Sequence, residues 1–136
     1  MILSQAAATA ALNALTSNLG TNATCVLYSG TPPAGPDTAL SGNTALVTGT
    51  ISSWSTPAYN STNGGMTSTA TFSASSYAPA ASGTATFGRL LTSGGVAQEQ
   101  LTVGTSGADI IVGTTSIVTG TNVVMSMSLT VPSQSV

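Results

Sequence analysis

The sequence contains no histidine and no lysine, and its charged side chains are limited to one arginine and three acids. Histidine is the commonest general base and the commonest metal ligand, so its absence removes the usual starting point of both kinds of site. Serine is plentiful, but a serine nucleophile needs a neighbouring base. One cysteine and three scattered acids cannot assemble a zinc or calcium site. We therefore expect no enzymatic activity, no metal and no cofactor.

The scarcity of charge also bears on the surface. Charged residues make up 3% of the chain, against about a quarter in ordinary globular proteins. Either hydroxyl and amide groups alone hydrate the exterior, or other protein covers much of it. A monomer of 13.2 kDa would expose roughly 6,400 Å², and a standard interface hides about 800 Å² per partner. Two or three such contacts would cover much of this surface, so we favour an assembly component.

The scarcity of positive charge argues against nucleic acid and acidic membrane surfaces as partners. One arginine cannot neutralise a series of phosphates, so we expect no binding to nucleic acid. A polybasic membrane contact fails for the same reason, and there is no run of 18 apolar residues to cross a bilayer. The single cysteine, Cys25, lies in an apolar run, which favours a buried, inert thiol over a reactive one. We therefore expect neither a disulfide framework nor secretion.

Leucine, isoleucine, valine and phenylalanine together form about a fifth of the chain, close to the limit below which a core fails to form. The apolar residues nevertheless fall in period-2 runs, and the net charge is only −2. Both observations favour a folded chain over a disordered one. The length predicts a single β domain over residues 1–136.

Residues 3–19 form the only helical candidate. Its apolar positions follow the i, i+3, i+4 spacing of one helical face and are Ala8, Ala11, Leu12, Leu15 and Leu19. Ser4 is suited to cap its start, and Gly20 can end it in a left-handed conformation. The other face carries no charge, so the helix must dock on a sheet or a neighbour.

All later signals indicate strands. Short runs of alternating apolar and polar residues recur at spacings near ten residues, and the clearest is 123–131, where Met125, Met127 and Leu129 alternate with serine and threonine. About eight such strands favour a mainly β fold, an antiparallel β-sandwich or jelly roll with one N-terminal α-helix.

Residues 31–42 contain three prolines and predict a stiff, extended loop. We expect this Pro-rich arm to pack against a neighbour, with Pro32, Pro33 and Pro36 as candidate interface residues. Trp54 lies near Tyr59 in the sequence, and such a cluster either anchors an interface or caps the core. The sequence leaves these two alternatives for Trp54 and Tyr59 open.

The only cation, Arg89, lies in an alternating run that Ser93, Gly94 and Gly95 interrupt with a hairpin turn. A two-residue loop would place Arg89 opposite Gln100 and would mix glutamines with the apolar face. A three-residue loop places Arg89 opposite Glu99 and gathers the apolar side chains on one side, so we choose this register. It predicts an Arg89–Glu99 pair, which we interpret as a structural ion pair rather than as a catalytic acid steered by an arginine.

Four segments together resemble a family of small proteins encoded in the structural-gene region of tailed bacteriophages. They are LYSGTPP at 27–33, PDTALSGNT at 36–44, FGRLLTSGG at 87–95 and VGTSGADI at 103–110. The likeness covers most of residues 3–131 in order and spacing, and it departs in the middle, over 54–81. It implies a virion component.

The resemblance leads us to expect a capsid decoration, or cement, protein on the outer capsid surface, assembled in the cytoplasm of the bacterial host. Its partners would be the major capsid protein and copies of itself, for example in a trimer. The alternatives are a connector or tail-tube component and a host-recognition or carbohydrate-binding module of a fibre or tail. The recognition module would use Tyr28, Trp54 and Tyr59 as stacking platforms for sugars.

Overall fold

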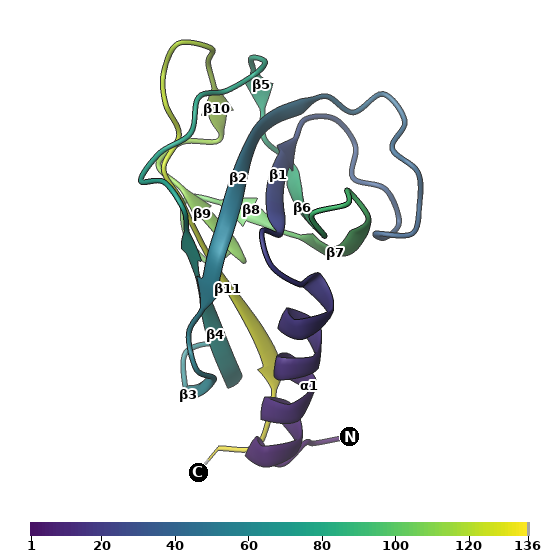
Figure 1. Ribbon diagram of the computed structural model, residues 1–136, viewed down its shortest axis with the longest axis vertical. Helices are drawn as coiled ribbons and strands as arrows, with labels where there is room; N and C mark the ends of the chain where they lie inside the picture. Colours follow the sequence, from purple (N-terminus) through teal and green to yellow (C-terminus); the bar gives the residue numbers. More distant parts are fainter. Residues whose placement is uncertain (136) are drawn as a thin grey trace.

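The computed structural model describes residues 1–135, which form one helix and eleven strands (Figure 1). In chain order the elements are α1 (Gln5–Leu19), β1 (Thr24–Tyr28), β2 (Ala45–Trp54), β3 (Ala58–Asn60), β4 (Gly65–Phe72), β5 (Gly83–Thr84), β6 (Phe87–Leu91), β7 (Ala97–Leu101), β8 (Val103–Gly104), β9 (Ile110–Val112), β10 (Ser116–Ile117) and β11 (Met125–Pro132). The expected mainly β fold with one N-terminal helix is confirmed.

Nine strands form one large sheet, in which β7, β6, β1, β2, β4, β11, β9 and β8 follow one another and β3 is added beside β4. β7 and β8 are the two ends of this order, yet only Thr102 separates them in the chain. The sheet therefore curls until its two ends meet at Thr102, where the strand passes from one half of the sheet to the other. All pairs in it are antiparallel except β8 with β9, which is parallel.

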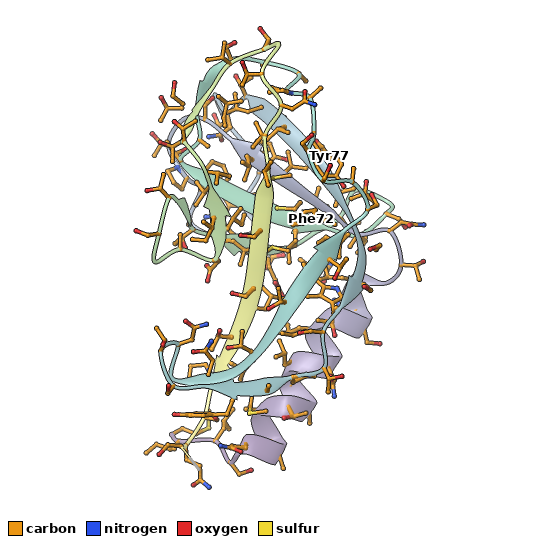
Figure 2. All side chains as sticks on the ribbon, turned by 90° about the vertical axis from the view of Figure 1, so that its left-hand side faces the viewer. Phe72 and Tyr77 are labelled. Carbon is orange, nitrogen blue, oxygen red and sulfur yellow. The ribbon has the colours of Figure 1, made fainter. Side chains whose placement is uncertain are left out.

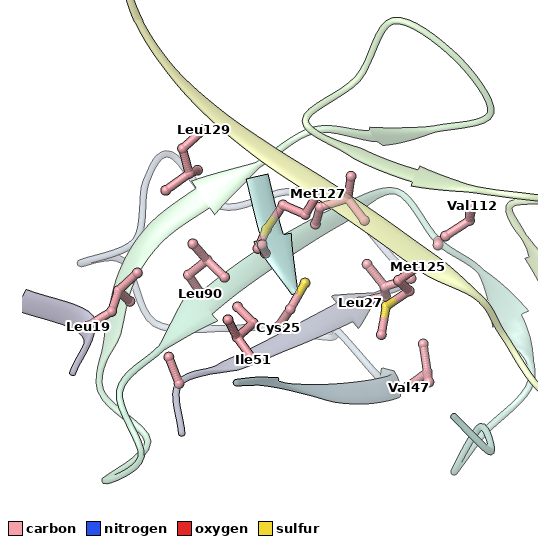
Figure 3. Packing of buried hydrophobic residues seen from close by; sticks show 14 of the residues in the cluster. Leu19, Cys25, Leu27, Val47, Ile51, Leu90, Val112, Met125, Met127 and Leu129 are labelled. Atoms are coloured by element: carbon pink, nitrogen blue, oxygen red, sulfur yellow. The ribbon is translucent and has the colours of Figure 1, made fainter. Parts of the chain in front are cut away.

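The main core fills the space between the two halves of this curled sheet (Figure 3). Cys25 and Leu27 of β1 and Leu90 of β6 point toward Met125 and Met127 of β11. All five side chains are buried. The sheet thus packs on itself as a β-sandwich, and apolar burial between its halves is the principal stabilising contribution.

The helix begins and ends where its capping residues indicate. The Oγ of Ser4 accepts a hydrogen bond from the amide of Ala7 at 3.1 Å, and Gly20 has a positive φ of 74°. Ala8, Leu12 and Leu19 are buried against the sheet, where α1 contacts β4 and β11 (Figure 2). Leu15, expected on the same buried face, is instead 40% exposed.

The strand predictions hold for most of the chain. β11 alternates between buried and exposed side chains as expected for a half-buried strand, and β1 is buried on both faces. The two-sided burial of β1 has a structural cause: the main core covers one face, and a second cluster covers the other. In that second cluster the ring of Tyr28 stacks on that of Phe87, with centroids 5.2 Å apart.

Candidate interaction surface

The Pro-rich arm, residues 31–42, is a loop as expected, and Arg89 of β6 fastens it to the sheet. The guanidinium Nη2 donates hydrogen bonds to the carbonyl oxygens of Gly35 at 3.0 Å and Thr38 at 2.7 Å. The Arg89 side chain is only 5% exposed. The single cation of the chain therefore lies beneath the arm and binds main-chain oxygens.

Gln100 of β7 completes this anchor. Its Oε1 accepts hydrogen bonds from Nε and Nη2 of Arg89, each at 3.2 Å, and its Nε2 donates to the carbonyl oxygen of Pro33 at 2.7 Å. Asn43 closes the base of the arm by donating to the carbonyl oxygens of Ser29 and Thr31, both at 3.0 Å. The arm is thus held at its middle and at its base.

The predicted Arg89–Glu99 ion pair is wrong, because β7 contains a bulge. The three-residue loop itself is correct: the amide of Thr92 donates to the carbonyl oxygen of Val96 at 2.9 Å. Leu91 pairs with Ala97, but Leu90 pairs with Glu99, so Gln98 is an extra residue. The extra residue shifts the register by one, which places Arg89 opposite Gln100 and turns Glu99 to the other face of the sheet.

Glu99 consequently lies on the core side of the sheet without a counterion. Both of its carboxylate oxygens are buried, and neither has a hydrogen-bond partner among residues 1–135. Burial is the main cause that raises the pKa of Glu99 above its ordinary value, and the nearby charge of Asp109 adds to it. Asp109 is itself tied to the corner of the sheet, since its Oδ2 accepts hydrogen bonds from the amide and the Oγ1 of Thr102.

Charge is nearly absent from the exterior of the described chain. Arg89 is buried, and Glu99 and Asp109 are half-buried, which leaves Asp37 of the arm as the one charged side chain among residues 1–135 that is exposed. The accessible surface of the molecule is 6833 Å². The exterior is therefore formed almost entirely by hydroxyl, amide, main-chain and apolar groups.

The candidate interface residues fall into two separate places. Pro32 is exposed, while Pro33 and Pro36 are half-buried in the arm above Gln100. Trp54 and Tyr59 lie at the end of the molecule that carries β3, remote from the arm in Figure 1, and both are partly buried against the main core. The structure therefore brings the prolines together with Arg89, but it does not join them to the aromatic pair.

The three aromatic residues expected to stack on sugars, Tyr28, Trp54 and Tyr59, are partly or wholly covered by other side chains. Tyr28 is 7% exposed because it stacks on Phe87, so its face is covered. For Trp54 and Tyr59, which the sequence left between an interface anchor and a core cap, the packing against the main core favours the cap.

One surface feature was missed by the sequence interpretation. A hollow of about 370 Å³ lies between 113–118 and 121–124, and it contains Ile117, Val118, Val123 and Val124 among its lining residues. Val118 and Val124 are exposed. The adjacent pairs Ile117-Val118 and Val123-Val124 could have indicated it, because in a half-buried strand one member of each pair must face outward.

The described residues contain no group of three histidine, cysteine or acidic side chains that could hold a metal ion. Within the same residues, no helix has the length and apolar character needed to cross a bilayer. In comparisons with known proteins, no family model, no curated protein and no solved structure matches this chain.

Proposed function

We propose that this protein is a non-enzymatic structural subunit of a larger assembly, specifically a capsid decoration protein of a tailed bacteriophage. The observation that supports the proposal is the exterior of 6833 Å², on which Asp37 is the one exposed charged side chain of residues 1–135. Ordinary soluble proteins devote about a quarter of their residues to charge. A surface without charge loses little by permanent contact, because few ions must leave water.

The arm supplies a specific contact region. Arg89, Gln100 and Asn43 hold it from below, while Pro32 faces solvent and Leu40 is 38% exposed. A segment that is already fixed loses little conformational entropy when it binds, so the anchored arm is suited to docking. Repetition of such contacts over many copies on a shell would multiply their effect.

The bacteriophage assignment rests on the resemblance of the segments at 27–44 and 87–110 to virion proteins. Under this proposal the partners are the major capsid protein and further copies of the chain, on the outer surface of the capsid. The fibre module loses support because Tyr28 is covered. A connector or tail-tube role differs from decoration chiefly in the number of copies per particle.

The first test measures the number of copies of the protein per particle. Quantitative mass spectrometry of purified virions is expected to find hundreds of copies per particle, and particles stripped of the protein are expected to rebind it and to release their genome at higher temperature. A few to a dozen copies would indicate a fibre or connector. Absence from the particle, together with a stable monomer by light scattering, would overturn the proposal.

A pair of variants tests whether the arm forms the contact with the particle. Leu40→Asp adds a charge to an exposed apolar position of the arm, and it is expected to abolish rebinding to stripped particles. Ser61→Asp adds the same charge at an exposed position in the turn after β3, and it is expected to rebind like the wild type. Equal rebinding by both variants, with unchanged melting temperatures, would exclude the arm as the contact.

A further inference from the structure

Glu99 occupies the junction of four parts of the fold. A hollow of about 400 Å³ at this point is lined by Leu15 of α1, Pro36 of the arm, Leu129 of β11, and Asp109 beside Glu99 itself. The side chain of Asn18 donates a hydrogen bond to Oε1 of Gln98, which fastens α1 directly to β7. Strand β7 is therefore bonded both to the helix and, through Gln100, to the arm.

The charged groups around this junction are few. Asp109 faces Glu99 from the turn before β9, and it brings a second negative charge. Arg89 belongs to the adjacent strand β6, but its side chain lies on the opposite face of the sheet and binds Gln100 and the arm. Asp37 follows Pro36 in the arm and is exposed. The helix and β11 contribute only uncharged residues to the lining.

An unpartnered carboxyl group in such a place favours its neutral form over its ionised form. Protonated, Glu99 is neutral, as are Leu101 and Leu129, which line the same hollow. Ionised, it is a buried charge without a counterion among residues 1–135, next to the carboxylate of Asp109, and such a charge is costly to keep out of water. Movement of β7 away from the helix would return the carboxylate to solvent.

We propose that the junction of α1, the arm and β7 is a pH-sensitive joint, which is closed while the Glu99 carboxyl carries its proton and opens when that proton is lost. The closed state binds the proton more tightly than the open state. Its stability is therefore complete at pH values below the ordinary glutamate range, and it is lost as the pH rises through the raised pKa of Glu99. This inference is independent of the proposed capsid role.

The composition makes the joint unusually easy to test. The chain has no histidine, and its acidic side chains are Asp37, Glu99 and Asp109, so each acid can be replaced in turn by its uncharged amide. The measurement is amide hydrogen exchange of the full chain at several pH values. Conversion of the exchange rates to protection factors removes the intrinsic pH dependence of exchange. Release of one proton on opening lowers protection by up to about tenfold per pH unit within the transition.

In the wild type, we expect protection to fall with rising pH in β7 and in the C-terminal half of α1, and to persist in β1 and β2. Glu99→Gln keeps the shape of the protonated side chain without its titration, so its protection in β7 is expected to be high at every pH. Asp109→Asn removes the neighbouring charge while its amide oxygen can still accept from Thr102, and it is expected to make the fall in protection smaller and to end it at lower pH. Asp37→Asn is the matched control and is expected to leave the profile unchanged.

The charge of Asp109 affects the pKa of Glu99 in the closed joint. Asp109 opposes ionisation of Glu99 in the closed joint and so raises its pKa there. Without that charge the ionised form is better tolerated, so less protection is lost at neutral pH and the fall is smaller. Wild-type protection in β7 that does not change with pH would overturn the joint, as would an unchanged pH dependence in Glu99→Gln or its loss in Asp37→Asn.

Discussion

Arg89 lies opposite Gln100 across the β6–β7 pair, and this one-residue difference from the expected register separates the cation of the chain from its buried acid. Arg89 is turned outward and holds the arm through two carbonyl oxygens. Glu99 is turned toward the core and meets Asp109 instead. A single bulge thus creates both the anchor of the arm and the unpartnered carboxyl group.

Removal of the arginine should loosen the arm. Arg89→Ala leaves the carbonyl oxygens of Gly35 and Thr38 without their charged donor, and we expect a loss of roughly 2 to 4 kcal/mol in the free energy of unfolding, measured with urea. Arg89→Lys keeps the charge but not the forked geometry, so an intermediate loss is expected. Limited proteolysis should cut the arm faster in both variants.

The matched control for the anchor is Thr38→Ala. Thr38 reaches Arg89 through its main-chain oxygen, so loss of its side chain leaves the contact intact. Wild-type resistance of the arm to protease in Arg89→Ala would contradict the anchoring role.

A close approach between β4 and β11 makes Gly65 intolerant of any side chain. A Cβ at Gly65 would collide with the main chain of Val131 and Pro132, which cannot move aside as a flexible side chain can. We expect Gly65→Ala to cost about 1 to 3 kcal/mol, read from thermal or urea unfolding. Gly113→Ala is the control, because no atom lies within 4 Å of its Cβ position. Equal stability of the two variants would refute the close approach.

The buried thiol of Cys25 should be inert in the native protein. Burial raises the pKa of Cys25 to about 12, so at pH 8 about one thiol in ten thousand is ionised, and the side chain is inaccessible. A thiol-specific reagent is expected to label the native protein very slowly and the urea-unfolded protein within minutes. Rapid labelling without denaturant would show that the core around β1 opens readily.

Tyr77 fastens the loop after β4 to β2, and its ring meets Phe72 edge to face with centroids 6.1 Å apart (Figure 2). Its hydroxyl donates to the carbonyl oxygen of Thr50 at 3.1 Å and accepts from the amide of Ala74 at 3.0 Å. Tyr77→Phe removes these two bonds and the contact of 3.1 Å between the hydroxyl groups of Tyr77 and Ser73, and we expect a loss of about 1 to 2 kcal/mol in the free energy of unfolding. Tyr59→Phe is the control, since the Tyr59 hydroxyl has no hydrogen bond among residues 1–135. An equal effect of both substitutions would argue against this role.

Much of the fold could be predicted because its signals are local. The cap at Ser4, the glycine at 20 and the apolar spacing between them defined the helix, and alternation defined β11. The turn at 93–95 was also predicted with the correct length. Each of these features depends on residues within a few positions of one another.

The candidate site could be predicted only in part, because its decisive feature is a bulge. The run Gln98, Glu99 and Gln100 presents three polar residues in succession, and no local rule says which of them is the extra one. Packing decides: Leu90 and Leu101 must both reach the core, and Gln100 must reach the arm. The exposure of Leu15 has a similar cause, since it lines the hollow beside Glu99 and not the centre of the core.

The meeting of β7 and β8 at Thr102 has a consequence for how copies of this protein can join. An open sheet offers two long rows of unpaired main-chain groups, and neighbours readily extend it strand by strand without limit. Here the terminal strands of the curled sheet are only Ala97–Leu101 and Val103–Gly104, and they turn toward each other. Extension of the sheet by backbone pairing at these two ends is thereby restrained, so a contact made there with another chain would depend mainly on side chains.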